Sequence, residues 1–467
     1  MLPERVLEPV SDVGRIPAEP ARGYRRTDLG NAERLVARHG DDLRYCHPWQ
    51  RWLVWDGRRW RPDDSGEVDR RAKETIRELL ASAHEIDDDA ERKRLLKHVL
   101  ESERVQRIRA AIELARSEAG IPVQPDELDV EPLVFNVENG TIYLEVGDCM
   151  EHDRAQLITK LAPVSYDQHA QAPRWQQFLE RVLPEADVRA FLARLVGYAL
   201  TGLRHEQILP IAYGPGANGK STLVEILLAL FGDYGQQAPA ETFLERRDSI
   251  PNDVARLRGA RLVIAAEISE GRRLNEALVK RMTGGDRMVA RFMRGEWFEF
   301  EPTFTPLLVT NHRPEIVGTD EAIWRRILLI PFDVTIPPEE RDPRLPAKLR
   351  EELPGILNWA LEGCLAWRDN GLNPPDAVRA ATSAYREDMD AIGGFLADCC
   401  LLRDGLRTKA SDLHTRYEYW SAANGEKPLS AKAVASRLKE RGFKQHRTGN
   451  ARWWLGLGLI DDTRQEP

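Results

Sequence analysis

Residues 214–221 have the types and spacing of a phosphate-binding loop: they read Gly-Pro-Gly-Ala-Asn-Gly-Lys-Ser and match the pattern Gly-x-x-x-x-Gly-Lys-Ser/Thr. Glycines in such a loop let the backbone turn its N–H groups toward the β- and γ-phosphates. Lys220 adds a positive charge, and the Ser221 hydroxyl is a ligand for Mg²⁺. We therefore predict a site for ATP and Mg²⁺. Its expected nucleotide-binding residues are Gly214, Pro215, Gly216, Ala217, Asn218, Gly219, Lys220, Ser221 and Thr222.

Two carboxylates follow the loop by about 45 to 50 residues. Residues 261–267, Arg-Leu-Val-Ile-Ala-Ala-Glu, form an apolar run that ends in Glu267. A carboxylate at a strand end can hold Mg²⁺ through water and orient the attacking water. Glu270 is a second candidate for polarising that water. The alternative is a buried strand that ends in a surface glutamate.

An amide and two arginines complete the candidate catalytic set. Residues 305–311 are an apolar strand that ends in Asn311, where the amide can bridge the γ-phosphate and the lytic water. Asparagine also ends strands for turn reasons alone. Arg325 and Arg326 precede the apolar run 327–331. An arginine there can reach the γ-phosphate on a neighbouring subunit and stabilise transition-state charge; the alternative is a solvated basic pair.

A hairpin is expected between the acidic strand and the asparagine strand. Two alternating runs within residues 289–300 meet at Met-Arg-Gly-Glu, which places Arg291 and Arg294 near the tip, with Phe292 beside them. Basic and aromatic side chains together can grip a phosphodiester backbone and contact bases. The alternative is an ordinary surface hairpin whose aromatic rings face the core.

The elements that must position the loop are present on both sides of it. An apolar run precedes it at 207–213, and an amphipathic helical pattern follows at 222–231. This strand–loop–helix order is the context in which the motif is specific. The N-terminal end of the following helix adds a partial positive charge beside the anion.

Composition limits the remaining possibilities. With 467 residues, 30% charged and 42% hydrophobic, the chain is typical of a soluble protein of two to four domains. No apolar run reaches the length of a membrane span, and the N-terminus lacks the apolar core of a signal peptide. Five scattered cysteines disfavour disulfides and a zinc site, and favour the cytoplasm. Because the net charge is −8, any nucleic-acid surface must be local.

The chain divides into five predicted segments. Dipeptides Asp56-Gly57 and Asn139-Gly140 predict hairpin turns, and charged residues 67–120 predict two or three helices. The segments are a flexible arm (1–25), an α+β domain (26–170), an α/β ATPase core with its leading helices (171–340), a helical connector (341–389) and a small C-terminal domain (390–467).

The C-terminal segment predicts a winged helix-turn-helix that binds duplex DNA. Helices are expected at 411–420 and at 430–441, and strands flank residues 448–451. Residues 421–455 hold eight Lys/Arg against two Glu, although the whole protein is acidic. The alternative is a solvated amphipathic helix beside a structural hairpin. Candidate DNA contacts are Lys432, Arg437, Lys439 and Arg447.

The order of these motifs resembles superfamily 3 helicases, and specifically the helicase portion of the phage/plasmid primase-helicase family, over about residues 26–460. The resemblance implies AAA+ type modules in hexameric rings that move on single-stranded DNA, usually 3′ to 5′. It implies that Glu267 is the Walker B acid and Asn311 is sensor 1. It also implies that Arg325 or Arg326 is a finger acting in trans, and that residues 291–296 form the central-channel DNA loop.

Two departures from the family pattern limit what the resemblance implies for this chain. The acidic cluster reads Glu-Ile-Ser-Glu at 267–270 rather than the type Glu-Thr-Glu-Glu, so the division of labour between Glu267 and Glu270 stays open. The chain also starts at the segment ahead of the ATPase, so we expect no primer synthesis by this polypeptide.

The expected fold is therefore α/β: a P-loop NTPase core of the AAA+, superfamily 3 type, with an α+β N-terminal domain and a C-terminal winged-helix domain. The expected function is an ATP-dependent DNA helicase of phage or plasmid replication. Its expected partners are single-stranded and forked DNA, further copies in a homo-hexamer, a separate primase and other replication proteins, with no membrane. An ATP-switched initiator or loader is the alternative, and a small-molecule kinase is a distant third.

Overall fold

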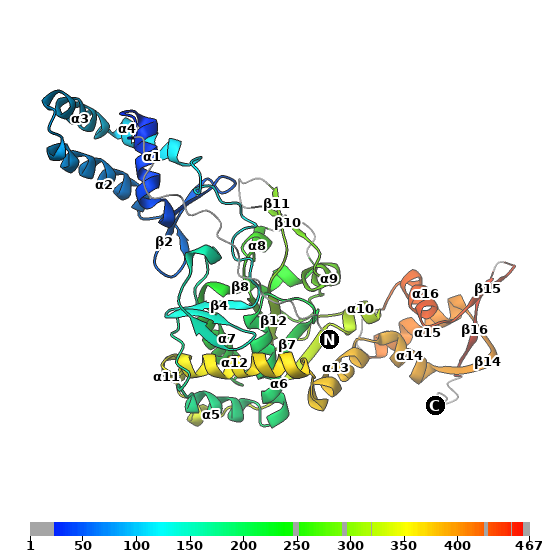
Figure 1. The fold of residues 1–467 in the computed structure, drawn as a ribbon. Coiled ribbons are helices and arrows are strands. Elements are labelled where there is room, and N and C mark those ends of the chain that lie inside the picture. Colours follow the sequence, from blue (N-terminus) through cyan, green and yellow to red (C-terminus); the bar gives the residue numbers. More distant parts are fainter. Residues whose placement is uncertain are drawn as a thin grey trace. The chain divides into compact units, whose positions relative to one another are not determined.

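The computed structural model describes residues 23–245, 252–291, 297–318, 320–424, 428–449 and 451–460, so most of the expected arm at 1–25 lies outside the described residues. The chain forms two compact units (Figure 1). One comprises Met1–Val130 and His152–Lys160, and the other comprises Glu131–Glu151 and Leu161–Pro467. The second unit thus includes strands that the sequence analysis assigned to the domain at 26–170.

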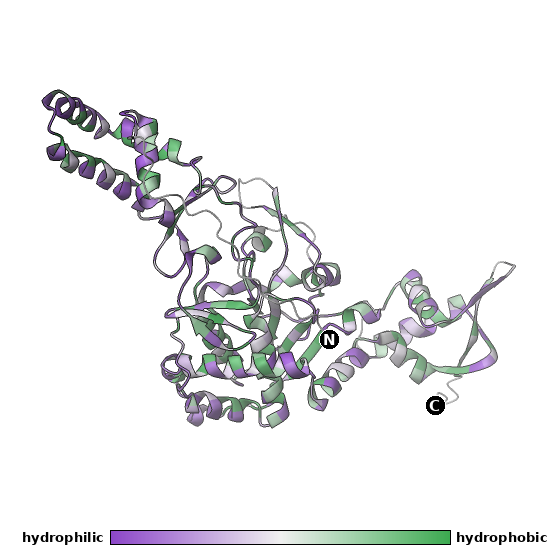
Figure 2. Ribbon diagram, viewed as in Figure 1, coloured by the Kyte–Doolittle hydropathy of each residue, from purple (hydrophilic) through white to green (hydrophobic). Residues whose placement is uncertain are grey.

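The first unit combines a small antiparallel sheet with largely hydrophilic helices (Figure 2). The helices are α1 (Asp28–His39), α2 (Glu67–Ala81), α3 (Asp89–Ser102) and α4 (Val105–Ala115), and the strands are β1 (Leu43–Cys46), β2 (Arg51–Trp55) and β3 (Trp60–Pro62). The predicted turn at Asp56-Gly57 is longer than the two residues that the dipeptide indicated. The Asp56 carboxylate accepts the amides of Arg58 and Arg59, both at 3.0 Å, and so stabilises a four-residue loop.

The tryptophans of this hairpin serve packing. Trp60 is fully buried, and the Arg44 guanidinium lies 4.7 Å from the centre of its ring. Trp52 and Trp55 are half-buried and border the cores of the first unit. A tryptophan ring can stack on a nucleic-acid base only where a face of the ring is exposed. Because the Trp60 ring is enclosed, we assign Trp60 to the hydrophobic core.

A parallel five-stranded sheet forms the centre of the second unit, so the molecule is a mixed α/β protein. The order is β13-β7-β12-β9-β8, and every neighbouring pair is parallel. Because the strands are parallel, their carboxyl ends share one edge of the sheet. The strands are β7 (Leu209–Tyr213), β8 (Gly235–Pro239), β9 (Leu262–Ala266), β12 (Thr305–Thr310) and β13 (Ile327–Pro331).

Both faces of this sheet are covered, which explains why β7, β9, β12 and β13 are continuous apolar runs, whereas the edge strand β8 reads Gly-Gln-Gln-Ala-Pro. In β9, Ile264 belongs to one hydrophobic core, whereas Val263 and Ala265 belong to the other. The helices of this unit up to residue 388 are α5 (Pro173–Val182), α6 (Ala186–Leu200), α7 (Lys220–Phe231), α8 (Asn252–Ala255), α9 (Glu276–Gly284), α10 (Glu321–Trp324), α11 (Leu345–Arg350), α12 (Leu353–Asn370) and α13 (Asp376–Asp388).

Helices α6 and α12 approach so closely that glycine is required at their crossing. A Cβ added to Gly197 would lie 2.1 Å from the backbone nitrogen of Cys364. A Cβ added to Gly363 on the other helix would lie equally close, 2.1 Å, to the carbonyl oxygen of Ala193. These contacts involve backbone atoms, so relief requires the two helices to separate.

We therefore expect Gly197→Ala to lower the free energy of unfolding by about 1–3 kcal/mol, as overpacking does in other cores. Urea denaturation measures this change. Gly216→Ala is the matched control, because its added Cβ meets nothing within 4 Å and Gly216 has no positive φ. The control should stay within about 0.5 kcal/mol of the wild type. Equal stability of both variants would contradict the packing account.

A second small sheet, formed by β4 (Val134–Val137), β5 (Gly140–Tyr143) and β6 (Asp148–Met150), packs within this unit. Phe135 stacks on Tyr234, with ring centroids 4.7 Å apart. The predicted turn is shifted by one residue: Val137 pairs with Gly140, so residues 138 and 139 form the turn. The Asn139 side chain instead bonds the backbone of Tyr166 through both its amide nitrogen and its oxygen.

The C-terminal segment folds around its own core, which includes Phe395, Tyr417, Leu438 and Trp454. The Ser430 hydroxyl accepts the Ala433 amide at 3.3 Å and so caps the start of α16. The elements are α14 (Ala391–Cys399), β14 (Cys400–Lys409), α15 (Ala410–Ala423), α16 (Ala431–Glu440), β15 (Gln445–Thr448) and β16 (Ala451–Leu459), and the antiparallel sheet order is β14-β16-β15.

None of the five cysteines forms a disulfide. Among the described residues, no group of His, Cys, Asp and Glu side chains is arranged to hold a metal ion. No helix in the described part of the chain has the length and apolar character needed to cross a membrane.

Candidate nucleotide and nucleic-acid sites

The predicted phosphate-binding loop connects β7 to α7, and the structure gives it an unusual backbone. Gly219 has φ +84° and immediately precedes the helix, a left-handed conformation that glycine adopts without strain. The loop is also fixed to the segment after β13. The Asn218 side-chain nitrogen donates to the Phe332 carbonyl at 2.8 Å, and the Ile336 amide donates to the Ala217 carbonyl at 2.7 Å.

Lys220 points its ammonium group into this loop. Its Nζ donates to the carbonyls of Gly214 and Pro215, at 2.7 and 3.0 Å, and to Asn218 Oδ1 at 2.9 Å. Lys220 is 6% exposed, and within the described parts of the chain no carboxylate accepts from its ammonium group. Burial lowers the pKa of Lys220 to about 8. A buried cation whose partners are all neutral fits an anionic ligand such as a triphosphate.

This environment predicts a pH dependence of nucleotide binding. Below about pH 8 free Lys220 is protonated, whereas above its pKa the free protein loses the charge that a bound phosphate would retain. Binding above pH 8 therefore takes up a proton, and affinity for a fluorescent ATP analogue should fall by up to about tenfold per pH unit. A fluorescence titration between pH 7 and 9.5 measures this. Lys220→Arg should flatten the profile because the guanidinium stays charged; a flat wild-type profile would contradict the assignment.

Glu267 and Asn311 reach the same edge of the sheet as the loop. Strand β12 lies between β7 and β9, with Thr310 opposite Tyr213 and Val309 opposite Ala266. Asn311 and Glu267 come directly after these strands, beside the loop that follows Tyr213. Both side chains are exposed, as is Glu270, three residues farther along. Ser221, in the first turn of α7, is also exposed.

Backbone strain is found at several of the predicted positions. Glu267 has φ +67° and Ala217 has φ +60°, backbone angles that residues other than glycine rarely adopt. Gln207, just before β7, has φ +51°. Strain of this kind costs of order 1–3 kcal/mol per residue and is concentrated at functional sites.

Arg325 and Arg326 lie at the opposite edge of the sheet. Strand β13 starts at Ile327, which pairs with Leu209 at the beginning of β7. The length of β7 therefore separates them from the loop of their own chain, roughly 20 Å from residue 207 to residue 214. This separation exceeds the reach of an arginine side chain.

The two arginines have different environments. Arg326 is 6% exposed and donates to Thr283 Oγ1 at 3.0 Å, to Gln207 Oε1 at 3.3 Å and to the Ala322 carbonyl. Burial, and then the positive charge of Arg325, lowers the pKa of Arg326. Arg325 is exposed, with a bond of 3.2 Å to Gln207 Oε1. Arg326 is therefore held within the fold by its own chain, whereas Arg325 is exposed.

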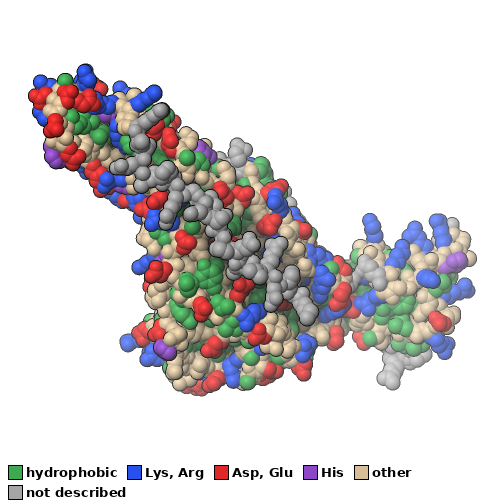
Figure 3. Space-filling model, viewed as in Figure 1, with side chains coloured by type: hydrophobic (Ala, Val, Ile, Leu, Met, Phe, Trp, Pro, Cys, Tyr) green, Lys and Arg blue, Asp and Glu red, His purple; other side chains and the backbone are tan. Residues whose placement is uncertain are grey.

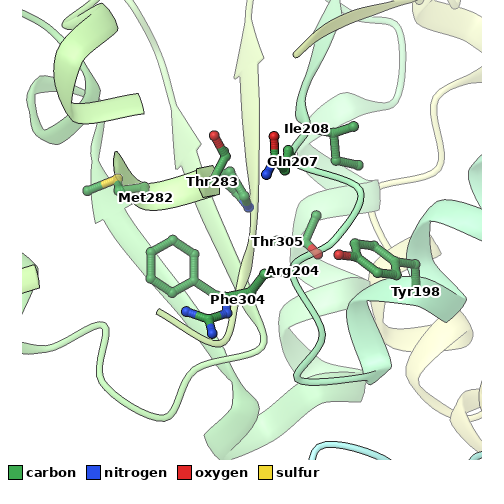
Figure 4. Close-up of a pocket in the computed structure, with 9 residues that line it drawn as sticks. Tyr198, Arg204, Gln207, Ile208, Met282, Thr283, Phe304 and Thr305 are labelled. Atoms are coloured by element: carbon green, nitrogen blue, oxygen red, sulfur yellow. The ribbon is translucent and has the colours of Figure 1, made fainter. Parts of the chain in front are cut away.

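A small pocket at this edge is not a nucleotide site. Figure 4 shows its lining, which includes Tyr198, Arg204, Gln207 and Thr283. Its volume is about 10 Å³, which is room for about one water molecule. It lies at the beginnings of β7 and β12, away from Lys220.

The predicted hairpin forms from β10 (Met288–Arg291) and β11 (Trp297–Phe300), with Met288 opposite Phe300. The Arg291 guanidinium lies 4.9 Å from the centre of the exposed Trp297 ring. The tip, including the predicted DNA contacts Phe292 and Arg294, lies outside the described residues.

The predicted contacts of the C-terminal domain differ among themselves. Lys432 and Lys439 on α16 are exposed, as is Arg447 on β15. Arg437 was expected at the same surface but is 9% exposed, and its guanidinium donates to the Val317 carbonyl at 2.7 Å. Arg437 thus differs from the other three candidates in being largely buried, with one guanidinium nitrogen bonded to a backbone carbonyl.

Sequence reasoning missed two residues that shape these sites, Gln207 and Arg313, and it named Asn218 without predicting the contacts that Asn218 makes. Gln207 binds both arginines, yet a glutamine before a strand carries no signal. Asn218 occupies a variable position of the loop motif but links Lys220 to the Phe332 carbonyl. Arg313 lies two residues beyond Asn311, with its guanidinium 5.2 Å from the ring centres of Tyr213 and Tyr385.

Three families match successive parts of the chain. Residues 32–184 match the family described as "D5 N terminal like", residues 212–326 match "Family of unknown function (DUF5906)", and residues 387–455 match "Poxvirus D5 protein-like". The second match covers the phosphate-binding loop, Glu267 and Asn311, and the third covers most of the C-terminal domain.

Similar curated proteins come from large DNA viruses. A "Putative helicase" of Acanthamoeba polyphaga mimivirus is 28% identical over 323 residues, covering 64% of this chain and 34% of the relative. A "Putative helicase" of Frog virus 3 is 26% identical over 269 residues (53% and 28%), and a "Putative primase" of African swine fever virus is 23% identical over 327 residues (64% and 34%). The chain thus spans about a third of the length of these relatives.

Among solved structures, the apo structure of the NrS-1 C-terminal region (305–718) is similar with a TM-score of 0.48 and 10% identity. The alignment covers 93% of this chain and all of that one. A second apo form of the same region has a TM-score of 0.46 and covers 92% of this chain.

Proposed function

Because the chain belongs to the primase-helicase family of superfamily 3 helicases, we propose that it is an ATP-driven DNA helicase of phage or plasmid replication. The observation that carries this proposal is the division of the candidate catalytic groups between two edges of one sheet. Lys220, Glu267 and Asn311 lie at the carboxyl edge, whereas Arg325 lies at the other edge. One chain then supplies the nucleotide loop and its neighbour supplies the arginine.

Within one subunit, the loop would hold the triphosphate through backbone N–H groups and Lys220. Ser221 and Glu267 are the residues that would hold Mg²⁺, which would neutralise charge on the β- and γ-phosphates. Glu267 or Glu270 would orient the attacking water, and the Asn311 amide would bridge that water and the γ-phosphate. The exposure of these four side chains supports such contacts, since a ligand can approach each of them.

Between subunits, Arg325 would stabilise the charge that develops on the transferred phosphoryl group. A head-to-tail interface that repeats by rotation closes into a ring, so we propose a homo-hexamer. The exposure of Arg325 and the burial of Arg326 support this choice of finger.

We further propose that the ring passes single-stranded DNA through its centre and contacts it with the β10–β11 hairpin. Arg291 and the exposed Trp297 support this role, because cations attract the backbone and aromatic rings stack on bases. The C-terminal domain is proposed as a winged helix that places α16 on duplex DNA, with Lys432, Lys439 and Arg447 as contacts. We propose a cytoplasmic location, with a separate primase and other replication proteins at the fork.

A replication initiator or loader is the second candidate function. The positive charge of residues 421–455 favours it, since a duplex-binding domain attached to an ATPase can assemble at an origin with little unwinding. The two functions differ in whether ATP hydrolysis moves the protein along a strand.

Strand displacement from a forked duplex separates these candidates. A motor should release the labelled strand in an ATP-dependent reaction with wild-type protein, and Lys220→Ala should abolish release because phosphate binding is lost. The measurement is gel separation of products with a trap strand, with a slow ATP analogue as the control. ATP hydrolysis without any displacement, together with tight duplex binding, would favour the initiator and contradict the motor.

A further inference from the structure

We propose that the solvent face of the sheet β14-β16-β15 binds single-stranded nucleic acid, with Trp453 as a stacking platform. We call this surface the outer sheet face and define it by Arg407, Lys409, Lys444, His446 and Trp453. It is separate from helix α16 and from the β10–β11 hairpin. The inference goes beyond the proposed motor, because binding here requires no ATP.

Strand register brings these residues to one side of the sheet. Trp453 in the central strand β16 is opposite Lys409 of β14 and His446 of β15. Residues directly opposite each other in an antiparallel pair share a face. In the next row, Arg407 is opposite Leu455, whose amide donates to the Lys444 carbonyl at 3.0 Å.

The other side of the sheet is the one that packs on the domain core. Trp454, adjacent to Trp453, is 2% exposed and belongs to the C-terminal core. The Thr408 hydroxyl, between Arg407 and Lys409, is buried and donates to the Leu457 carbonyl at 2.8 Å. Figure 1 shows α14 and α15 beside these strands. Because successive residues alternate between faces, Arg407, Lys409 and Trp453 point away from the helices.

Positive charge on the outer sheet face is uncompensated. Arg407, Lys409, Lys444 and His446 are all exposed, and among the described residues none of them forms an ion pair. Some exposed arginines of this unit do have a carboxylate partner; Arg386, for example, bonds Glu321 at 2.8 Å. Figure 3 shows Lys and Arg side chains gathered on the C-terminal domain. Like charges held together without counterions favour a polyanionic ligand.

The aromatic ring of Trp453, which lies among these basic residues, favours a single strand over a duplex. The Arg407 guanidinium lies over the partly exposed Trp453 ring, 5.0 Å from its centre, so a base can contact the outer side of the guanidinium and the part of the ring that it leaves exposed. Bases stack on aromatic rings and on guanidinium planes. In a duplex the base faces are already stacked on one another, whereas in a single strand they are accessible. The surface therefore fits a single strand better than a duplex.

Fluorescence anisotropy with the full chain and no nucleotide tests this inference. The probe is a labelled oligothymidylate of about 20 nucleotides. This is longer than the roughly 4–16 nucleotides that one small single-strand-binding domain of the OB-fold type covers. Trp453→Ala should weaken binding about 5- to 150-fold, the range for loss of one stacked base. Binding of a labelled hairpin duplex should change less than about twofold, since the ring cannot reach stacked bases. Tyr419→Ala is the matched control, because Tyr419 is an exposed aromatic residue on α15 of the same domain.

Lys409→Ala and Lys444→Ala provide an independent measurement, because each should reduce the slope of log affinity against log salt by about 0.7. Both positions are exposed, so the fold should be retained. Because the assay contains no nucleotide, a loss of affinity in these variants does not depend on the ATP site. Unchanged single-strand affinity in Trp453→Ala, with unchanged salt slopes in both lysine variants, would overturn the inference. An equal loss of affinity for the duplex and for the single strand in Trp453→Ala would also overturn the inference.

Discussion

Arg325→Ala is expected to lower kcat for ATP hydrolysis by about 10³- to 10⁵-fold, the contribution of an arginine that stabilises the charge of a transferring phosphoryl group. Nucleotide affinity should change little, since the binding loop of each chain stays intact. The free energy of unfolding should change by less than about 0.5 kcal/mol, because Arg325 is exposed. Steady-state hydrolysis in the presence of single-stranded DNA, with urea denaturation alongside, measures both effects.

The adjacent Arg326 provides the contrasting variant. Its guanidinium is buried and bonds Thr283, Gln207 and the Ala322 carbonyl. Arg326→Ala should therefore lower the free energy of unfolding by about 2–4 kcal/mol, because it leaves buried acceptors unsatisfied. If Arg325→Ala were destabilised while Arg326→Ala were stable but inactive, the assignment of roles would be reversed.

Lys220→Ala is the second variant with a large expected effect. Loss of its ammonium group should lower kcat by about 10²- to 10³-fold, as removal of one preorganised electrostatic contact does in other enzymes, and should weaken binding of the ATP analogue. Stability should stay within about 1 kcal/mol or rise, because the variant removes a desolvated charge whose acceptors, among the residues that the structure describes, are all uncharged. Hydrolysis assays measure the change in kcat, and thermal unfolding measures the change in stability.

Lys280→Ala is a suitable control for this variant. Lys280 forms an exposed pair with Asp320 at 2.7 Å and contacts no part of the loop. Its removal should leave hydrolysis unchanged, because exposed ion pairs contribute roughly 0–1 kcal/mol and no catalytic contact is lost. Retained hydrolysis in Lys220→Ala would mean that the loop does not hold the triphosphate.

Four of the five strands of the central sheet were predictable, because parallel strands covered on both faces are typically continuous apolar runs; the polar edge strand β8 was missed. The runs at 207–213, 261–267, 305–311 and 327–331 each contain one observed strand. Their order in the sheet was not predictable, since it depends on helices and connections far apart in the sequence. That order brings Asn311 between the loop and Glu267, and it places Arg325 at the far edge.

The sequence was less informative where environment decides a residue's role. Arg325 and Arg326 are adjacent and chemically identical, yet one is exposed and the other is buried against Thr283. Arg437 lies on a basic helix but is held by the Val317 carbonyl. Strand β14 was missed because its Asp404-Gly405 interrupts the apolar pattern, at a register shift between Leu402 and Arg407.

The account's central claim is that each nucleotide site is completed by a neighbouring subunit. Mixing Lys220→Ala with Arg325→Ala protein tests it most directly, because each variant retains the half that the other lacks. In equal mixtures about one quarter of the interfaces join an intact loop to an intact arginine, so DNA-stimulated hydrolysis should recover to about a quarter of the wild-type rate. A mixture no more active than the sum of the two separate variants would contradict the shared site.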